Sequence, residues 1–199
     1  MSSVSILIAY EDILSGAVLK RVLSYFAQKF LILRELHQNG FGYLKKNTPN
    51  WNRVAKHIPV LMVTDLDKKN CPPSLIKEWL KDKKHPDFLF RIAVREVEAW
   101  LLADSENFAS FLNISKAKIP LKPESNQDPK ALLLSLVAKC PKRQLKSEML
   151  PVKGGTAKQG PNYNECLIRF VQNHWDVKQA ASNANSLKRM LHRLEQFSL

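Results

Sequence analysis

The chain has 199 residues, 45% of them hydrophobic, which is enough to bury one sizeable core. Its 31 lysines and arginines outnumber 18 acidic residues, which gives a net charge of +13. No apolar run approaches the ~20 residues of a transmembrane helix, and the N-terminal residues lack a secretory signal, so we expect a cytoplasmic protein without membrane association. The excess of positive charge favours a polyanionic partner, nucleic acid in particular.

Strand-like and helix-like segments alternate in the first half of the chain. The expected strands are residues 3–11, 31–38, 58–67 and the start of 87–112; the expected helices are 12–30, 51–57, 72–84 and the end of 87–112. Residues 39–50 are predicted to form a loop, because glycine, asparagine and proline punctuate them. The alternation predicts an α/β fold: a parallel sheet with helices on both faces.

The second half of the chain is predicted to be mainly helical. Residues 113–130 are polar and punctuated by proline, and helices are expected over 128–140, 162–174 and 177–197. No glycine- and serine-rich linker separates the halves. We therefore predict one domain, residues 1–199, with an α/β core over 1–113 and a helical C-terminal extension over 114–199 packed on it.

Three predicted strands end in acidic residues. These are Glu11 and Asp12 after the first strand, Asp65 and Asp67 after the most apolar one, and Glu96 and Glu98 after the last. The carboxyl ends of parallel strands meet at one edge of a sheet. Asp65 and Asp67 should point the same way if the strand reaches residue 67. Clustered carboxylates repel unless a cation or a proton relieves them, and oxygen ligands suit Mg²⁺ or Mn²⁺.

Simpler structural roles are open for the same residues. Asp12 is more typical of a helix N-cap than of a metal ligand. The two aspartates after the most apolar strand could form an Asx turn. Of the two glutamates after the last strand, we expect one to face the site and the other to pair with Arg91 or Arg95.

An apolar strand ending in glutamate, followed later by one ending in Asp-x-Asp, resembles the Toprim domain of topoisomerases, primases and OLD-type nucleases. Residues 92–104, 153–163 and 174–195 are more closely similar to small bacterial Toprim-like proteins of unassigned function, often encoded beside ATPases in phage-defence clusters. The resemblance covers most of the chain. It implies a Toprim-like core, a Mg²⁺- or Mn²⁺-dependent nuclease or nickase, DNA favoured over RNA, and a possible partner ATPase.

The resemblance carries over to individual residues. Glu11 matches the Toprim glutamate, and Asp65 and Asp67 match its Asp-x-Asp, so these three are expected to bind the metal and to be catalytic. Glu96 or Glu98 matches a further metal-binding acid of the OLD-like branch.

Two departures from the family pattern favour an alternative function. Asp12 stands where the Toprim glutamate is followed by glycine, and Ser15 stands where OLD-like members have another acid. The alternative is a catalytically inactive Toprim-like subunit that binds nucleic acid or forms a complex. A haloacid-dehalogenase-like phosphatase, suggested by "VTDLD", is disfavoured because Lys69 replaces the threonine or valine of that motif.

A basic stretch at residues 139–158 supplies candidates for phosphate binding. The predicted contacts to nucleic acid are Lys142, Arg143, Lys146, Lys153 and Lys158. Lys153 begins a glycine-rich segment whose backbone can approach a phosphate, so it is also predicted to assist catalysis. The Walker A spacing is absent, and nucleotide hydrolysis is not expected. The alternative for this stretch is a flexible basic surface loop.

Overall fold

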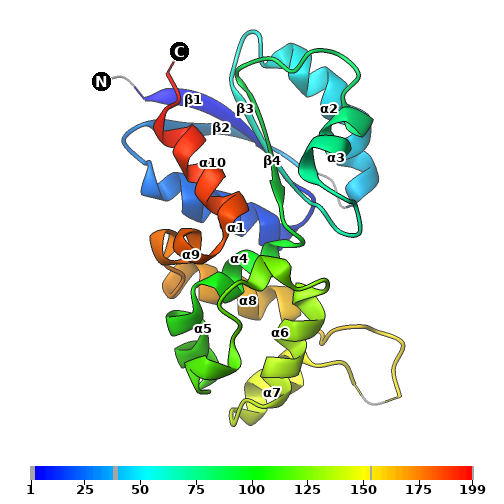
Figure 1. Ribbon diagram of the computed structural model, residues 1–199, viewed down its shortest axis with the longest axis vertical. Coiled ribbons are helices and arrows are strands. Elements are labelled where there is room, and N and C mark those ends of the chain that lie inside the picture. Colours follow the sequence, from blue (N-terminus) through cyan, green and yellow to red (C-terminus); the bar gives the residue numbers. More distant parts are fainter. Residues whose placement is uncertain (1–2, 38–39, 153, 199) are drawn as a thin grey trace.

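A computed structural model describes residues 3–37, 40–152 and 154–198. This part of the chain contains a four-stranded sheet, which lies in the upper half of Figure 1, above helices of the second half of the chain. The strands are β1 (Val4–Ala9), β2 (Phe30–Leu36), β3 (Val60–Asp65) and β4 (Phe88–Ala93). They lie in the order β2–β1–β3–β4, and each neighbouring pair is parallel. The predicted α/β fold with a parallel sheet is confirmed.

Helices connect the strands and dominate the chain after β4. They are α1 (Ile13–Tyr25), α2 (Phe41–Val54), α3 (Pro72–Trp79), α4 (Val97–Ala103), α5 (Ser105–Leu112), α6 (Pro129–Ala138), α7 (Arg143–Met149), α8 (Tyr163–Asn173), α9 (Val177–Asn183) and α10 (Asn185–Glu195), with 3₁₀ turns at Lys116–Lys118 and Pro123–Ser125. Among the described residues, no helix has the length and apolar character to cross a membrane. The mainly helical C-terminal half is confirmed.

Helices cover both faces of the sheet (Figure 1). On β3, Leu61 and Val63 pack with α1 and the C-terminal helices, whereas Val60 and Met62 pack with α2 and α3. This alternation follows from the two-residue period of a strand. Because both faces are covered, β3 is apolar at nearly every position, as the sequence predicted.

The C-terminal helices and one face of the sheet share a single cluster of buried side chains. Trp175, which follows α8, is fully buried in it and donates a hydrogen bond from Nε1 to the carbonyl of Trp100 at 3.2 Å. The carbonyl of Trp175 accepts a hydrogen bond from Arg21 of α1, also at 3.2 Å. These contacts tie the helical extension directly to the α/β core.

The predicted loop at residues 39–50 is wrong over its described part. Helix α2 begins at Phe41, ten residues before the predicted helix at 51–57, and it includes Pro49. Leu44 and Trp51 of this helix are buried against the sheet, and the hydroxyl of Thr48 donates to the carbonyl of Leu44 at 2.8 Å. Tertiary packing of this face outweighs the poor helix propensity of its glycine, asparagine and proline residues.

Two predicted helices are broken in the structure. The helix expected at the end of 87–112 divides at Asp104, whose carboxylate accepts hydrogen bonds from the N–H groups of Asn107 (3.4 Å) and Asp176 (2.7 Å). Asp104 is fully buried. Its hydrogen bond with the N–H of Asp176 ties the junction of α4 and α5 to the C-terminal half of the chain. The helix expected over 177–197 divides at Ala184 into α9 and α10.

Candidate functional site

The acidic strand ends lie side by side at one edge of the sheet. β1 pairs with β3, with Ala9 opposite Met62, and β3 pairs with β4, with Asp65 opposite Ala93. From β1 the chain adds β2 on one side and then β3 on the other, so the carboxyl ends of β1 and β3 form a topological switch point. Ligands of open α/β sheets bind at such points. The predicted adjacency of these two strands is confirmed.

Asp65, the last residue of β3, is surrounded by other carboxylates. Its Oδ1 accepts a hydrogen bond from the N–H of Val97 at 3.0 Å. Burial raises the pKa of Asp65 well above its ordinary value, and nearby negative charges raise it further. In order of effect, these charges belong to Glu98, Glu11, Asp67 and Asp12. Acidic side chains from the ends of β1, β3 and β4 are therefore close enough to repel one another at Asp65.

Asp67 does not share a strand face with Asp65, because β3 ends at Asp65. The φ angle of Asp67 is 49°, in the left-handed region. Its N–H donates to the carbonyl of Arg95 at 3.0 Å, and the Arg95 guanidinium donates to the carbonyl of Asp67 at 3.1 Å. Asp67 therefore lies in an exposed turn held against the segment after β4, and desolvation raises the pKa of its carboxyl group.

The two glutamates after β4 contact the C-terminal helices. Glu98 is only 6% exposed, and the hydroxyl of Tyr163 donates a hydrogen bond to its Oε1 at 3.0 Å. Burial, followed by repulsion from Glu96, raises the pKa of Glu98 to about 7. Glu96 accepts a hydrogen bond from the N–H of Lys130 at 2.9 Å, and burial raises its pKa as well.

The expected ion pair between one of these glutamates and Arg91 or Arg95 is wrong. Among the described residues, neither arginine forms an ion pair with Glu96 or Glu98. Arg95 instead donates to backbone carbonyls of the turn after β3, including that of Lys69 at 2.7 Å. The strand has ended before Arg95, so strand alternation does not set its direction.

The end of β1 supplies one helix cap and one acid of the cluster. Asp12 caps α1, because its Oδ1 accepts a hydrogen bond from the N–H of Ser15 at 2.7 Å. The N-cap prediction is therefore confirmed. Glu11 is half-buried, and its charge contributes to the raised pKa of Asp65. Glu11 thus belongs to the carboxylate cluster.

Two further residues complete this site and were not among those predicted for it: Lys130 of α6 and Tyr163 of α8. The Lys130 ammonium lies 4.9 Å from the centroid of the buried Tyr163 ring. Its positive charge lowers the pKa of Glu98, against the larger effect of burial. No spacing in the sequence connects these residues, because α4, α6 and α8 approach the strand ends only through the tertiary fold.

A pocket of about 540 Å³ lies beside the carboxylates. Residues 67–69 form one wall, Gln127 and Asp128 form another, and Glu96 also lines it. The pocket therefore presents carboxylates together with Lys68, whereas the ammonium of Lys69 is paired with Glu78 at 2.7 Å. A site that holds both a divalent cation and a phosphate needs this mixture of charges.

Three of the predicted basic residues, Lys142, Arg143 and Lys146, are not gathered at these carboxylates. Arg143 and Lys146 lie on α7, which follows the far end of α6 (Figure 1), and α6 alone has 10 residues, or roughly 15 Å of helix. The ammonium of Lys142 donates to a carbonyl of α5 at 2.7 Å. Lys158 is exposed in the loop between α7 and α8, and Lys153 lies outside the described residues.

Comparison with known proteins places the chain in a family. Residues 14–195 match a domain of unknown function, DUF4276. The chain belongs to this family. No curated protein and no solved structure matches it. The matched range contains the acids after β3 and β4 and begins three residues after Glu11.

The donor chemistry of the carboxylate cluster in this DUF4276 member fits Mg²⁺ or Mn²⁺. Its ligands would be hard carboxylate oxygens, and their repulsion at Asp65 is relieved by a divalent cation. Within the described ranges, no three His, Cys, Asp or Glu side chains are arranged around one point as metal ligands. Bonds from Val97, Lys130 and Tyr163 each engage a carboxylate oxygen. Each of these bonds leaves the second oxygen of its carboxylate as a candidate ligand, and the side chains would have to move closer together to surround an ion.

Proposed function

We propose that the protein is a metal-dependent nuclease or nickase of the Toprim type, with Mg²⁺ or Mn²⁺ bound at the carboxyl ends of β1, β3 and β4. One observation carries this proposal: Asp65 lies at the topological switch point, where the charges of carboxylates that follow β1, β3 and β4 raise its pKa. A concentrated negative charge in a chain of net charge +13 calls for a cation. Carboxylate-bound divalent ions are also the usual catalysts of phosphodiester cleavage.

The proposed ligands are Glu11, Asp65 and Asp67, with a further oxygen from Glu96. Glu98, the other acid predicted to bind the metal, instead lies beside the ion with its carboxyl group held by Tyr163. When bound, a divalent ion supplies a Lewis acid for a phosphate oxygen and acidifies an attacking water. The protein orients the substrate by charge: Lys68 of the pocket attracts the phosphate while the carboxylates exclude it from their own oxygens.

The chain's own residues provide proton transfer and positive charge. Glu98, with a pKa of about 7, can accept the proton of an attacking water near neutral pH, and Tyr163 holds its carboxyl group in place. The water oxygen forms the new bond to phosphorus as the bond to the leaving oxygen breaks, and that oxygen takes a proton from solvent. Lys130 lies where it can offset negative charge, the role predicted for Lys153.

The proposed substrate is nucleic acid, with DNA favoured over RNA. The net charge of +13 supports a polyanionic substrate. The Toprim resemblance adds a partner ATPase, a role in antiviral defence and action in the cytoplasm.

A second candidate is an inactive Toprim-like subunit that binds nucleic acid or assembles a complex. It is favoured by the hydrogen bonds that already engage Asp65, Glu96 and Glu98 with protein groups. In an inactive subunit these bonds would hold the carboxylates permanently as structural elements.

The test of the proposed function is cleavage. Purified protein is incubated with supercoiled plasmid and with labelled single- and double-stranded DNA and RNA, in Mg²⁺, Mn²⁺ or EDTA. We expect nicking or cutting with Mn²⁺ or Mg²⁺ and none in EDTA. If no nucleic acid is cut, including when any ATPase encoded beside the gene is added, the enzyme proposal is wrong and the inactive subunit is favoured.

A further inference from the structure

A groove of about 360 Å³ runs over the outer edge of β4, on the side away from β3. Its walls are the first turn of α3 on one face of the sheet and the first turns of α10 on the other, which lie on opposite sides of β4 in Figure 1. Its floor is formed by Phe90, Arg91 and Ile92 of β4 and by Val94, which follows the strand. Arg91 and Arg189 project from β4 and α10 into its lining.

Four cations gather along this groove and the start of β4. They are Lys84, Arg91, Arg189 and Arg193. The pKa of Arg91 is lowered by burial and then by the charges of Arg193 and Arg189. Burial, followed by the charge of Arg91, likewise lowers the pKa of Lys84. Arginine stays protonated at physiological pH, so the repulsion persists unless an anion enters.

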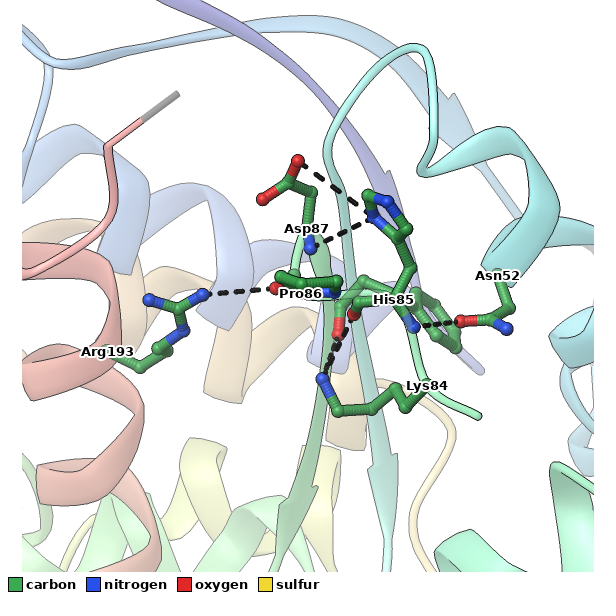
Figure 2. Close-up of polar contacts among 7 residues, drawn as sticks. Asn52, Lys84, His85, Pro86, Asp87 and Arg193 are labelled. Atoms are coloured by element: carbon green, nitrogen blue, oxygen red, sulfur yellow. Dashed lines mark hydrogen bonds and ion pairs between the residues drawn. The ribbon is translucent and has the colours of Figure 1, made fainter. Parts of the chain in front are cut away.

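Backbone contacts hold two of these cations in place (Figure 2). The Lys84 ammonium donates to the carbonyls of His85 (3.2 Å) and Phe88 (3.0 Å). Arg193 donates to the carbonyl of Pro86 at 3.1 Å, which leaves part of its guanidinium for another acceptor. The cluster is therefore fixed to the loop before β4.

Nearby acids do not neutralise the cluster. In the described ranges, none of the four cations forms an ion pair with a carboxylate. Glu124, which lines the groove, instead accepts hydrogen bonds from the N–H groups of Asn185 (2.8 Å) and Ser186 (3.0 Å) at the start of α10. Asp87 acts on Lys84 at longer range only. The cations are thus placed for an external anion.

We propose that this groove binds the phosphodiester backbone of the nucleic acid that the carboxylate cluster cleaves. The inference rests on the proposed function for the identity of the ligand, but its binding role does not require cleavage. Arg91 is two residues before Ala93, the partner of Asp65, so the backbone of Arg91 lies roughly 7 Å along β4 from the strand end that adjoins the cluster. A strand lying on Arg91 and Arg189 therefore continues toward the proposed metal ligands.

Arginines suit this role because a guanidinium binds phosphate oxygens in a bidentate manner. Most of the residues predicted to bind nucleic acid lie elsewhere in the sequence: Arg143 and Lys146 belong to α7, and Lys153 and Lys158 follow it. The groove instead adjoins β4, whose carboxyl end pairs with Asp65, and the cations along it come from two parts of the chain that are distant in sequence, residues 84–91 and residues 189–193.

The test measures binding of fluorescent DNA by anisotropy in EDTA, where the proposed chemistry cannot occur. We expect the double variant Arg91→Gln/Arg189→Gln to bind DNA roughly tenfold or more weakly. The slope of log K against log salt concentration should fall by the equivalent of about two phosphate contacts. The matched control, Lys116→Gln/Lys118→Gln, removes the same charge from the exposed turn after α5 and should bind like the wild type. Arg189→Gln alone changes an exposed residue, so a loss of binding in this variant cannot come from misfolding. Arg189→Lys keeps the positive charge and should restore most of the binding.

Three results would overturn the inference: unchanged DNA binding by the double variant and by Arg189→Gln, an equal loss in the lysine control, or tighter groove-dependent binding of poly-glutamate than of DNA. If the protein never cleaves DNA but the double variant binds it more weakly as expected, the groove is supported and the proposed enzyme activity is refuted. If the protein cleaves DNA but binds it independently of Arg91 and Arg189, the enzyme activity is supported and the groove is refuted.

Discussion

Asp65→Asn should abolish metal-dependent cleavage, with a loss of more than about 100-fold, because even outer-shell partners of a metal contribute 10- to 100-fold. Asparagine keeps the oxygen that accepts from the N–H of Val97, so the turn between β4 and α4 should persist. Only the negative charge is removed. The measurement is the initial rate of plasmid nicking in Mn²⁺, and circular dichroism confirms the fold.

Asp82→Asn is the matched control for this substitution. Asp82 is exposed in the segment between α3 and β4, so the same chemical change there should leave the rate unchanged. Equal rates for wild type and Asp65→Asn would show that the switch-point aspartate takes no part in the chemistry.

Glu98→Gln should stabilise the metal-free protein at alkaline pH and have little effect at acidic pH. The pKa of Glu98 is about 7 in the folded protein and 4.5 without the effects of the fold. Between these values the folded state holds a proton that the unfolded state has lost, so the free energy of unfolding falls as pH rises from 4.5 to 7. Above pH 7, the buried charge of Glu98 lowers the free energy of unfolding by on the order of 3 kcal/mol.

Glutamine can still accept the hydrogen bond from Tyr163 but carries no charge to bury. We therefore expect the variant to lose much of this pH dependence in urea unfolding curves recorded in EDTA. Some dependence should remain, because the pKa of Asp65 is raised too. Glu165→Gln, at an exposed position of α8, should follow the wild type. Parallel pH profiles for Glu98→Gln and wild type would refute a buried, charge-sensitive Glu98.

The strand ends were predictable because their signal is local. The apolar run before Asp65 marked a central strand, and the alternation of strands and helices marked a parallel sheet. Adjacency of Glu11 and Asp65 then followed from the rule that such sheets place their sites at the carboxyl edge. The N-cap at Asp12 was predictable for the same reason, since capping depends on residues within one turn.

The other features of the fold and the site depend on tertiary contacts, which leave no local pattern in the sequence. Helix α2 forms because Leu44 and Trp51 pack on the sheet, although the composition of residues 39–50 is typical of a loop. Lys130 and Tyr163 join the site through the packing of α6 and α8 near α4, and no sequence spacing encodes this. The cationic groove combines β4 with α10, about a hundred residues apart along the chain.

The central claim is that acids from the ends of β1, β3 and β4 form one cation-binding pocket. Its most direct test is calorimetric titration of Mn²⁺ into wild type and Asp65→Asn at about pH 8, where the Glu98 carboxyl is mostly ionised. We predict saturable binding to the wild type that disappears in Asp65→Asn. Absence of binding to the wild type, or binding of equal affinity to both proteins, would contradict the claim.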